Sequence, residues 1–539
     1  MMIVKSKKML KAFVLLSVVL GLAAFSALYF WDQTVKTKDE TPPASAGQYG
    51  VSAGNPLAVS VGMKILEDGG SAVDAAVAVA YTLGVVQPYG SGIGGGGAML
   101  IYPTDGKPPV FYDYQGVSPA NGQVPEGYVA VPGFVLAMET INEDLGTFPM
   151  NQLIAPSIDY AKNGFVVDAT LDKILHLSKS KLEIVQSSVF YNNGAQPGTG
   201  ILLTQPELAL TLSLIQKKGS NAFYRGELAD KIVAAVPGLE ASDLSSYKVS
   251  ASAPVTAKYG KYDIFSAPPP FGGVTLIQIL KMAEQLKVEN LTTDAKDLYT
   301  MSRIISTAYS KRLKTIADPK FYEMDSQNMV SPPYIDLMVQ DINKTLSFTS
   351  FDNEDTTHFV IIDKDGMMVS CTNSLSSWFG SGISTGGFFL NNHLKNFNQD
   401  PGNLNRLEGG KRPRTFMSPT IISLNGKPVL GIGTPGGNRI PAVLSQVLIN
   451  MLINGEDPQV AIDEPRFYVR GSVFYYEKVL PGSLAQELKN NGISTIHDTS
   501  PLNFGAVNCL YLDPFTSKIL GGADQRRGGA WAAKYLEKR

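Results

Sequence analysis

Apolar residues in the first part of the chain recur with the spacing of helices. In the segment 56–66, Val61, Ile65 and Leu66 fall on one face of a 3.6-residue period, and the glycines at 69–70 end the pattern. The same spacing predicts helices at 134–145, 150–163, 205–217, 227–236, 274–285 and 295–313. The chain up to about residue 340 is therefore predicted to be rich in helices.

A second helix is predicted after Ser71, because Asp74 follows three residues later, close to a capping box. This helix is rich in Ala and Val on all sides, so we expect it to be buried. A glycine-rich loop at 91–97 precedes a predicted strand at 98–102. The loop lacks the Lys-Ser/Thr of a phosphate-binding P-loop. Close backbone packing is therefore the better account of its glycines.

The pattern changes to that of strands at Thr356. Two apolar segments, 358–363 and 367–372, flank the turn signal Lys364-Asp365-Gly366. Further strands are predicted at 421–424, 429–433, 472–478 and 507–512, with a helix at 440–450. A sheet-rich second part therefore follows the helix-rich first part.

The hairpin around this turn predicts which residues face each other. If Asp365-Gly366 forms a two-residue loop, Thr357 lies opposite Ser374 and Thr356 lies opposite Leu375. Opposed side chains in such a pair are about 5 Å apart at Cβ. A hydroxyl at position 374 is therefore predicted beside the start of the first strand.

The N-terminus carries an apolar run, Ala12–Trp31, after several lysines. The run is long enough to span a bilayer, and its positive flank indicates the cytoplasmic side. We therefore predict a membrane anchor at 1–31 and a polar linker at 32–48. A cleaved signal peptide, with Ala24-Phe25-Ser26 near the cut, is the alternative. In both cases the body of the protein is expected at the extracellular face of the membrane or secreted.

The net charge and the histidine content bear on which partners and cofactors the protein is expected to bind. Lys and Arg number 46 and Asp and Glu 48, so the net charge of −2 argues against nucleic acid as a partner. The four histidines form no HExxH or similar ligand pair. We therefore expect no catalytic metal and no other cofactor.

The segment Asp355–Gly366, Asp-Thr-Thr-His-Phe-Val-Ile-Ile-Asp-Lys-Asp-Gly, resembles the processing site of γ-glutamyltransferases, which are N-terminal nucleophile hydrolases. Other segments match the family in order: Asn55–Ala58, Gly69–Ala76, Ser91–Gly97, Ala267–Gly273, Leu390–Asn392, Met417–Thr420, Pro435–Arg439 and Asp524–Arg527. The resemblance implies an α/β fold, a four-layer αββα sandwich. It also implies self-cleavage before Thr356, which gives a large subunit, 49–355, and a small subunit, 356–539, that remain together as a heterodimer.

The resemblance also implies the chemistry. The hydroxyl of Thr356 would be the nucleophile, and the amine freed by the cut would be its base. The acyl-enzyme formed with a γ-glutamyl group would then pass to water or to an amine acceptor. Ser374 stands where the family has a Thr that holds the nucleophile. The backbone N–H groups of Gly436 and Gly437 would form the oxyanion hole.

Several positions expected to bind substrate depart from the family. Gln115 replaces an Arg that binds the α-carboxylate, and Asn396 replaces an Asp that binds the α-amine. His393 lies in the same run as Asn396, 391–397, and is a further candidate to bind substrate. Thr415-Phe416 stands where the family has a Ser-Ser pair, which makes Thr415 another candidate. The lid between these segments, 398–411, is short. Candidates to supply the missing charge are Arg414, Arg439, Arg526 and Arg527.

These departures favour a γ-linked polymer, because an α-nitrogen inside a polymer is an amide and needs no carboxylate partner. Asn396 and the run 414–417 are similar to the poly-γ-glutamate capsule depolymerase branch of the family, although Gln115 departs from that branch too. We therefore predict a hydrolase/transpeptidase acting on poly-γ-glutamate. The alternatives are a γ-glutamyltransferase acting on glutathione or other small γ-glutamyl substrates, an acylase for glutaryl-like groups, and a non-catalytic binding protein on the same scaffold.

Overall fold

The computed structural model describes residues 48–185, 189–191, 195–344, 355–471, 473–480 and 482–535. The predicted anchor, 1–31, lies outside the described residues, as does the predicted linker except for Gln48. Within the described ranges, every helix is too short or too polar to cross a bilayer.

Two antiparallel sheets form the centre of the fold. The first has the order β20 (Ala530–Tyr535), β1 (Gln48–Ala53), β9 (Asp355–Ile362), β10 (Met368–Ser376), β2 (Gly96–Tyr102), β3 (Val110–Asp113), β6 (Ser250–Ser252). The second has the order β19 (Ile519–Ala523), β18 (Asn508–Leu512), β14 (Lys427–Gly433), β13 (Thr420–Leu424), β8 (Tyr262–Ser266), β7 (Val255–Tyr259). Both sheets therefore combine strands from before and after Thr356.

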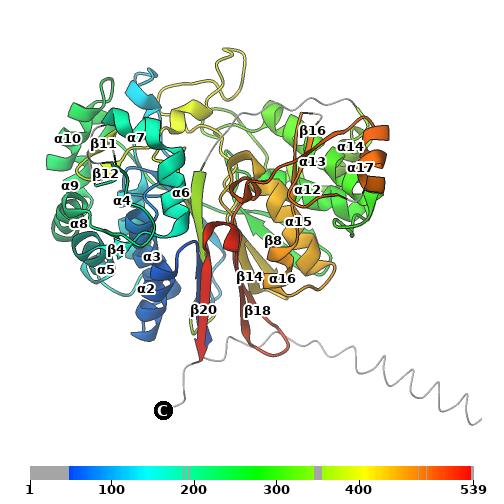
Figure 1. The fold of residues 1–539 in the computed structure, drawn as a ribbon, viewed down its shortest axis with the longest axis horizontal. Coiled ribbons are helices and arrows are strands. Elements are labelled where there is room, and N and C mark those ends of the chain that lie inside the picture. The colour runs from blue at the N-terminus through cyan, green and yellow to red at the C-terminus, as the bar shows by residue number, and fades with distance from the viewer. Residues whose placement is uncertain are drawn as a thin grey trace, which may run out of the picture. The chain divides into compact units, whose positions relative to one another are not determined.

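Helices cover the outer faces of the two sheets (Figure 1). One layer contains α2 (Pro56–Glu67), α3 (Ala72–Val86), α4 (Phe134–Leu145), α5 (Met150–Asn163), α6 (Ala169–Leu177), α7 (Lys179–Val185), α8 (Pro206–Lys218), α9 (Asn221–Tyr224), α10 (Glu227–Ala235) and α11 (Ala241–Ser245). The other contains α12 (Gly273–Leu286), α13 (Ala295–Thr315), α14 (Pro332–Gln340), α15 (Ile440–Leu452), α16 (Pro458–Asp463) and α17 (Gly482–Asn490). Short strands complete the fold: β4 (Phe165–Val166), β5 (Leu202–Leu203), β11 (Ser384–Thr385), β12 (Phe388–Phe389), β15 (Phe467–Arg470), β16 (Val473–Tyr476) and β17 (Ser494–His497).

The alternation along β9 explains why two sheets stack. Val360 and Ile362 belong to the apolar cluster between the sheets, whereas Phe359 and Ile361 belong to the cluster under α2–α11. Neighbouring residues of a strand point to opposite faces, so a strand that is apolar throughout must be covered on both sides. The predicted four-layer αββα sandwich is confirmed.

Most predicted elements are confirmed near their predicted bounds, including the capping box of Ser71 and Asp74 at the start of α3. The prediction that the range 134–340 is mostly helical holds, but it named no strands there, and β7 and β8 lie in this range and pair with each other. Both strands have partly exposed polar residues such as Thr256 and Asp263, so their apolar alternation is weak in the sequence.

The predicted register of the β9–β10 hairpin is wrong by one residue. Ser374 pairs with Thr356, and not with Thr357. The loop has three residues, 364–366, and Gly366 has a φ of 87°. The Asp363 carboxylate accepts from the N–H groups of Asp365 and Met367, each at 3.0 Å, which favours this longer turn over the two-residue loop.

Candidate active site

The glycine-rich loop packs directly against the hairpin that carries Thr356. A Cβ on Gly95 would lie 2.5 Å from the carbonyl oxygen of Ser374, and one on Gly90 would lie 3.2 Å from that of Thr356. Only glycine allows backbones to approach so closely. The prediction of close backbone packing is confirmed, and the loop fixes both strands where the predicted cut lies.

A β-bulge lies opposite the predicted cut. Thr356 pairs with Ser374 and Asp355 pairs with Ser376, so Leu375 is the extra residue of the bulge. Ser376 has a φ of 77°, and its N–H donates to the hydroxyl oxygen of Ser374 at 2.8 Å. Bulges commonly re-aim strand residues beside active sites. The structure thus brings Ser374 next to Thr356, and its hydroxyl supports the bulge.

The start of β9 is buried and held by hydrogen bonds. Thr356 is 2% exposed. The Thr357 hydroxyl donates to the side-chain oxygen of Gln87 at 2.7 Å, and the Gln87 amide donates to the carbonyl of Gly54 at 2.7 Å. Sequence reasoning missed Gln87. The sequence does contain a signal for Gln87: it is a lone amide at the end of an Ala- and Val-rich helix that is predicted to be buried. A buried amide needs a hydrogen-bond partner.

His358 is buried behind the predicted nucleophile. Its Nδ1 lies 2.9 Å from the Thr372 hydroxyl, and a Cβ on Gly433 would lie 2.2 Å from its ring. Burial lowers the pKa of His358 to about 3, so the imidazole is neutral at ordinary pH. The end of β14 thus rests on a residue two positions from Thr356.

The predicted oxyanion glycines follow this contact. Gly436 and Gly437 have φ values of 137° and 58°, a region that L side chains rarely adopt. Gly436 precedes the short helix η4 (Gly437–Arg439) and Gly437 begins it, and both come before the longer α15, whose N-terminus favours negative charge. The conformation explains why both residues are glycines. Their role as oxyanion donors remains a prediction.

Gln115 and His393 lie on the other side of the loop. A Cβ on Gly96, the register partner of Ser374, would lie 3.1 Å from the Cα of Gln115. A Cβ on Gly116 would lie 2.6 Å from Nδ1 of His393. Gln115 is 0% exposed, and its side-chain amide makes no hydrogen bond with a described residue. A buried polar group of this kind calls for a ligand or water as partner.

Asn396 ends the short helix η3 (His393–Asn396) and is partly buried, and its carbonyl accepts from the Asn405 amide at 2.6 Å. Thr415 is buried, and its N–H donates to the carbonyl of Pro270 at 3.1 Å. The guanidinium of Arg414 donates to the carbonyl of Leu313 at 2.7 Å, at the end of α13. Of the arginine candidates, Arg414 therefore stabilises a helix terminus.

Two of the other three arginine candidates, Arg439 and Arg526, differ in their surroundings. Arg526 binds both carboxylate oxygens of Glu477 and also contacts Asp524 at 3.2 Å, which makes it part of an ion network. Arg439 donates from Nε to the carbonyl of Gly436 at 3.2 Å. The structure therefore brings Arg439 to the predicted oxyanion glycines and uses Arg526 within the scaffold.

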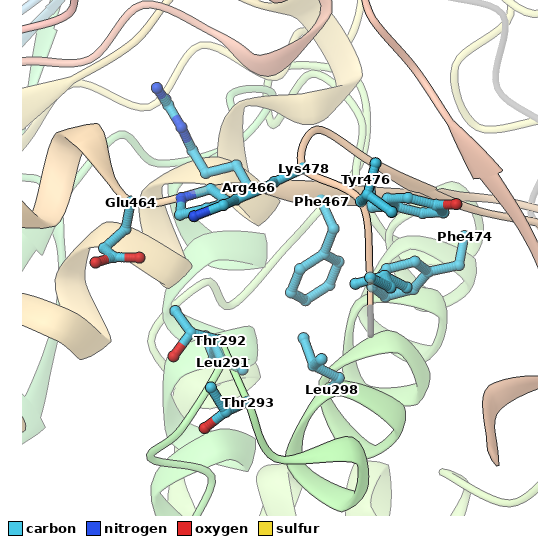
Figure 2. A pocket seen from close by; sticks show the side chains of 13 residues that line it. Leu291, Thr292, Thr293, Leu298, Glu464, Arg466, Phe467, Phe474, Tyr476 and Lys478 are labelled. Carbon is cyan, nitrogen blue, oxygen red and sulfur yellow. The ribbon is translucent and has the colours of Figure 1, made fainter. Parts of the chain in front are cut away.

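A separate pocket of about 260 Å³ lies between the start of α13 and the β15–β16 hairpin. Phe467 and Phe474 form one side of it, and Glu464 lies at the other (Figure 2). Arg466 also lines it and is held by the carboxylate of Asp524. None of the predicted site residues lines this pocket. Among the described residues, no group of three or more His, Cys, Asp or Glu is arranged to hold a metal.

The two buried histidines predict acid sensitivity of the uncut chain. Burial lowers the pKa of His358 to about 3 and that of His393 to about 4. The unfolded chain therefore binds more protons below about pH 6.5, and stability falls as the pH drops toward 4, by about 1.4 kcal/mol per pH unit for each histidine. Urea unfolding of uncut Thr356→Ala protein at several pH values measures this slope.

The matched comparison is the same protein carrying His393→Gln. Its slope between pH 6 and pH 4.5 should be smaller by the contribution of one histidine. Carboxylates contribute equally to both proteins, so they cancel in the difference. Identical slopes would contradict the buried, neutral state of His393.

Comparison with known proteins agrees with this geometry. The sequence profile of the family described as gamma-glutamyltranspeptidase matches residues 58–534. The capsule biosynthesis protein CapD proenzyme of Bacillus anthracis is 43% identical over 486 residues, 90% of each chain. The glutathione hydrolase proenzyme of Bacillus subtilis strain 168 is 31% identical, over 92% of this chain and 93% of the relative.

A solved structure supports the fold independently. Cephalosporin acylase from Bacillus halodurans matches with a TM-score of 0.83 and 26% identity, over 92% of this chain and 97% of that one. The profile match extends across both sheets and across the predicted cut. The chain is therefore an enzyme that belongs to the γ-glutamyltranspeptidase family.

Proposed function

We propose that this enzyme hydrolyses and transfers γ-glutamyl groups of poly-γ-glutamate at the outer face of the cell membrane. The proposal includes self-cleavage between Asp355 and Thr356. It is supported by the 43% identity to a relative named as a capsule biosynthesis proenzyme. It also rests on the polar groups that line the predicted donor site.

The observation that carries the proposal is the buried amide of Gln115, which makes no hydrogen bond with a described residue. The charged neighbour Asp113 is already paired with Arg412 at 3.2 Å. A neutral amide can donate to a carboxylate and accept from an amide N–H, so it suits a residue inside a polymer. A free amino acid terminus, with a full ammonium charge, fits a site with a carboxylate better.

The proposed reaction assigns its steps to Thr356 and the glycine pair. Its hydroxyl loses a proton to the freed amine and attacks the γ-carbonyl, and the oxygen that becomes negative is held by N–H groups of Gly436 and Gly437. The C–N bond then breaks, and the leaving nitrogen takes the proton. Water or a second amine attacks the resulting ester and releases Thr356. Neutral His358 takes no part in these proton transfers, because its pKa of about 3 is far below working pH.

The N-terminal segment completes the proposal. The apolar run Ala12–Trp31 would hold the enzyme at the membrane, with the body outside. Proteolytic release of the body from washed membranes, without detergent, tests this placement.

Side-by-side assays test the substrate. With equal amounts of cut enzyme, we expect poly-γ-glutamate to be shortened with a kcat/KM at least about tenfold above that for glutathione, because the donor site lacks the carboxylate partner of a free amine. Chain length is followed by gel filtration and glutathione by released cysteinylglycine. Faster turnover of glutathione would instead favour the small-substrate alternative, which the 31% identical glutathione hydrolase relative represents.

A further inference from the structure

A second cavity, of about 370 Å³, opens beside the predicted reaction centre. It includes Ser377, which directly follows the register partner of Asp355, and Arg439, whose Nε binds the carbonyl of Gly436. The cavity therefore lies between the residue that follows the bulge and the residue that holds the carbonyl of Gly436. The Gln115 amide belongs to neither of these segments and does not line this cavity.

The charged groups of this cavity are all cationic. Lys181, Arg439 and Arg527 line it, and no carboxylate is among the described residues that do so. An anion in the cavity would be attracted by all three of these cations. The indole N–H of Trp378 also lines the cavity region, is buried and makes no hydrogen bond with a described residue. It is a further donor for an anion.

Lys181 is held in position by the loop after the bulge. Its Nζ donates to the carbonyls of Trp378 at 2.7 Å and Gly380 at 2.9 Å, and its stem packs against Gly382. An ammonium has three N–H donors, so one remains for a ligand after these two bonds. Burial and the positive charge of Lys395 lower the pKa of Lys181 to about 8. The group is charged at neutral pH and carries an electrostatic cost that an anion would relieve.

We propose that the cavity lined by Lys181, Arg439 and Arg527 binds the α-carboxylate of the residue on the leaving side of the cleaved bond. This inference rests on the proposed function and adds a second carboxylate site to it. In a γ-linked glutamate polymer, the leaving nitrogen and this carboxylate are attached to the same carbon. The carboxylate therefore lies next to the reacting bond, as the cavity does. The donor residue's own α-carboxylate lies three carbons from the reacting carbonyl, so it belongs to a different site.

The test compares three substrates that share the γ-glutamyl donor. In γ-glutamyl-glutamate the leaving group carries the α-carboxylate, in γ-glutamyl-glutamate α-amide it is neutralised, and in γ-glutamyl-4-nitroanilide it is absent. We expect the enzyme to prefer the carboxylate over the amide by about ten- to a hundredfold in kcat/KM, the range of a charge-assisted hydrogen bond. Lys181→Met should lower this preference by about tenfold and leave anilide turnover within about twofold.

Two control variants separate charge from structure. Lys181→Arg should keep most of the preference, and Lys231→Met, which removes an exposed cation on α10, should keep all of it. A salt series on the unaltered enzyme gives an independent measure, since added salt should weaken the preference. An equal fall for all three substrates, or an unchanged preference in Lys181→Met together with no effect of salt, would overturn the inference. If the unaltered enzyme turns over the anilide but does not shorten the polymer, that result would instead contradict the proposed function.

Discussion

Thr356→Ala protein should remain a single polypeptide and lose γ-glutamyl transfer by on the order of 10⁴-fold or more, because the nucleophile of both reactions is removed. The fold should survive, since Thr356 lies at the start of β9 and the apolar residues from Phe359 onward supply the core contacts. Denaturing gels and turnover of γ-glutamyl-4-nitroanilide measure the two effects. The unaltered chain should give two bands, the smaller one beginning at Thr356.

Thr356→Ser is the matched variant, because it keeps the hydroxyl and removes only the methyl group. It should still cut itself, more slowly, and retain part of its activity. Edman sequencing of the small fragment should then begin with Ser at position 356. A Thr356→Ala protein that is still cut at the same bond would contradict both the processing and the mechanism.

The β9–β10 hairpin shows how far the sequence alone can go. Its apolar segments and turn signal predict the two strands and bring the hydroxyl of Ser374 close to Thr356. The register is not predictable from the turn, because Asp363 accepts two backbone N–H groups and extends the loop by one residue. The bulge at Leu375 is likewise absent from the local pattern, which reads as an ordinary strand. Register is decided by such contacts, and a slip of one residue reverses every side chain.

Residues that act through contacts with distant parts of the chain were the hardest to predict from the sequence. Gln87 directly follows α3 and accepts from Thr357, and Lys181 lies on α7 and donates to Trp378. Both partners are far away in the sequence. No motif surrounds either residue. The sandwich itself was predictable through the family resemblance, because its strands carry the ordered motifs. The use of Arg414 and Arg526 as scaffold residues follows only from their partners in the folded chain.

Gly433→Ala should destabilise the uncut protein by about 3 kcal/mol, because the added methyl group has no room. The new Cβ would lie 2.2 to 2.5 Å from three ring atoms of His358. The ring is fully buried and bonded to Thr372, so it cannot move aside without losing that bond. Urea unfolding in the Thr356→Ala background measures the change. In protein that keeps Thr356, Gly433→Ala should also slow self-cleavage, because the predicted oxyanion residue Gly436 lies only three residues after position 433.

The cause can be isolated with a control and a double variant. Gly482→Ala adds the same methyl group with no atom within 4 Å, so it should change stability by less than about 0.5 kcal/mol. His358→Ala removes the obstructing ring. If the ring is the obstacle, Gly433→Ala should cost much less in the His358→Ala background than alone, a coupling of about 1 to 3 kcal/mol. Additive losses would show that the methyl group acts elsewhere. Strong coupling would establish that the close contact between Gly433 and the ring of His358, two residues from the predicted nucleophile, admits no side chain at position 433.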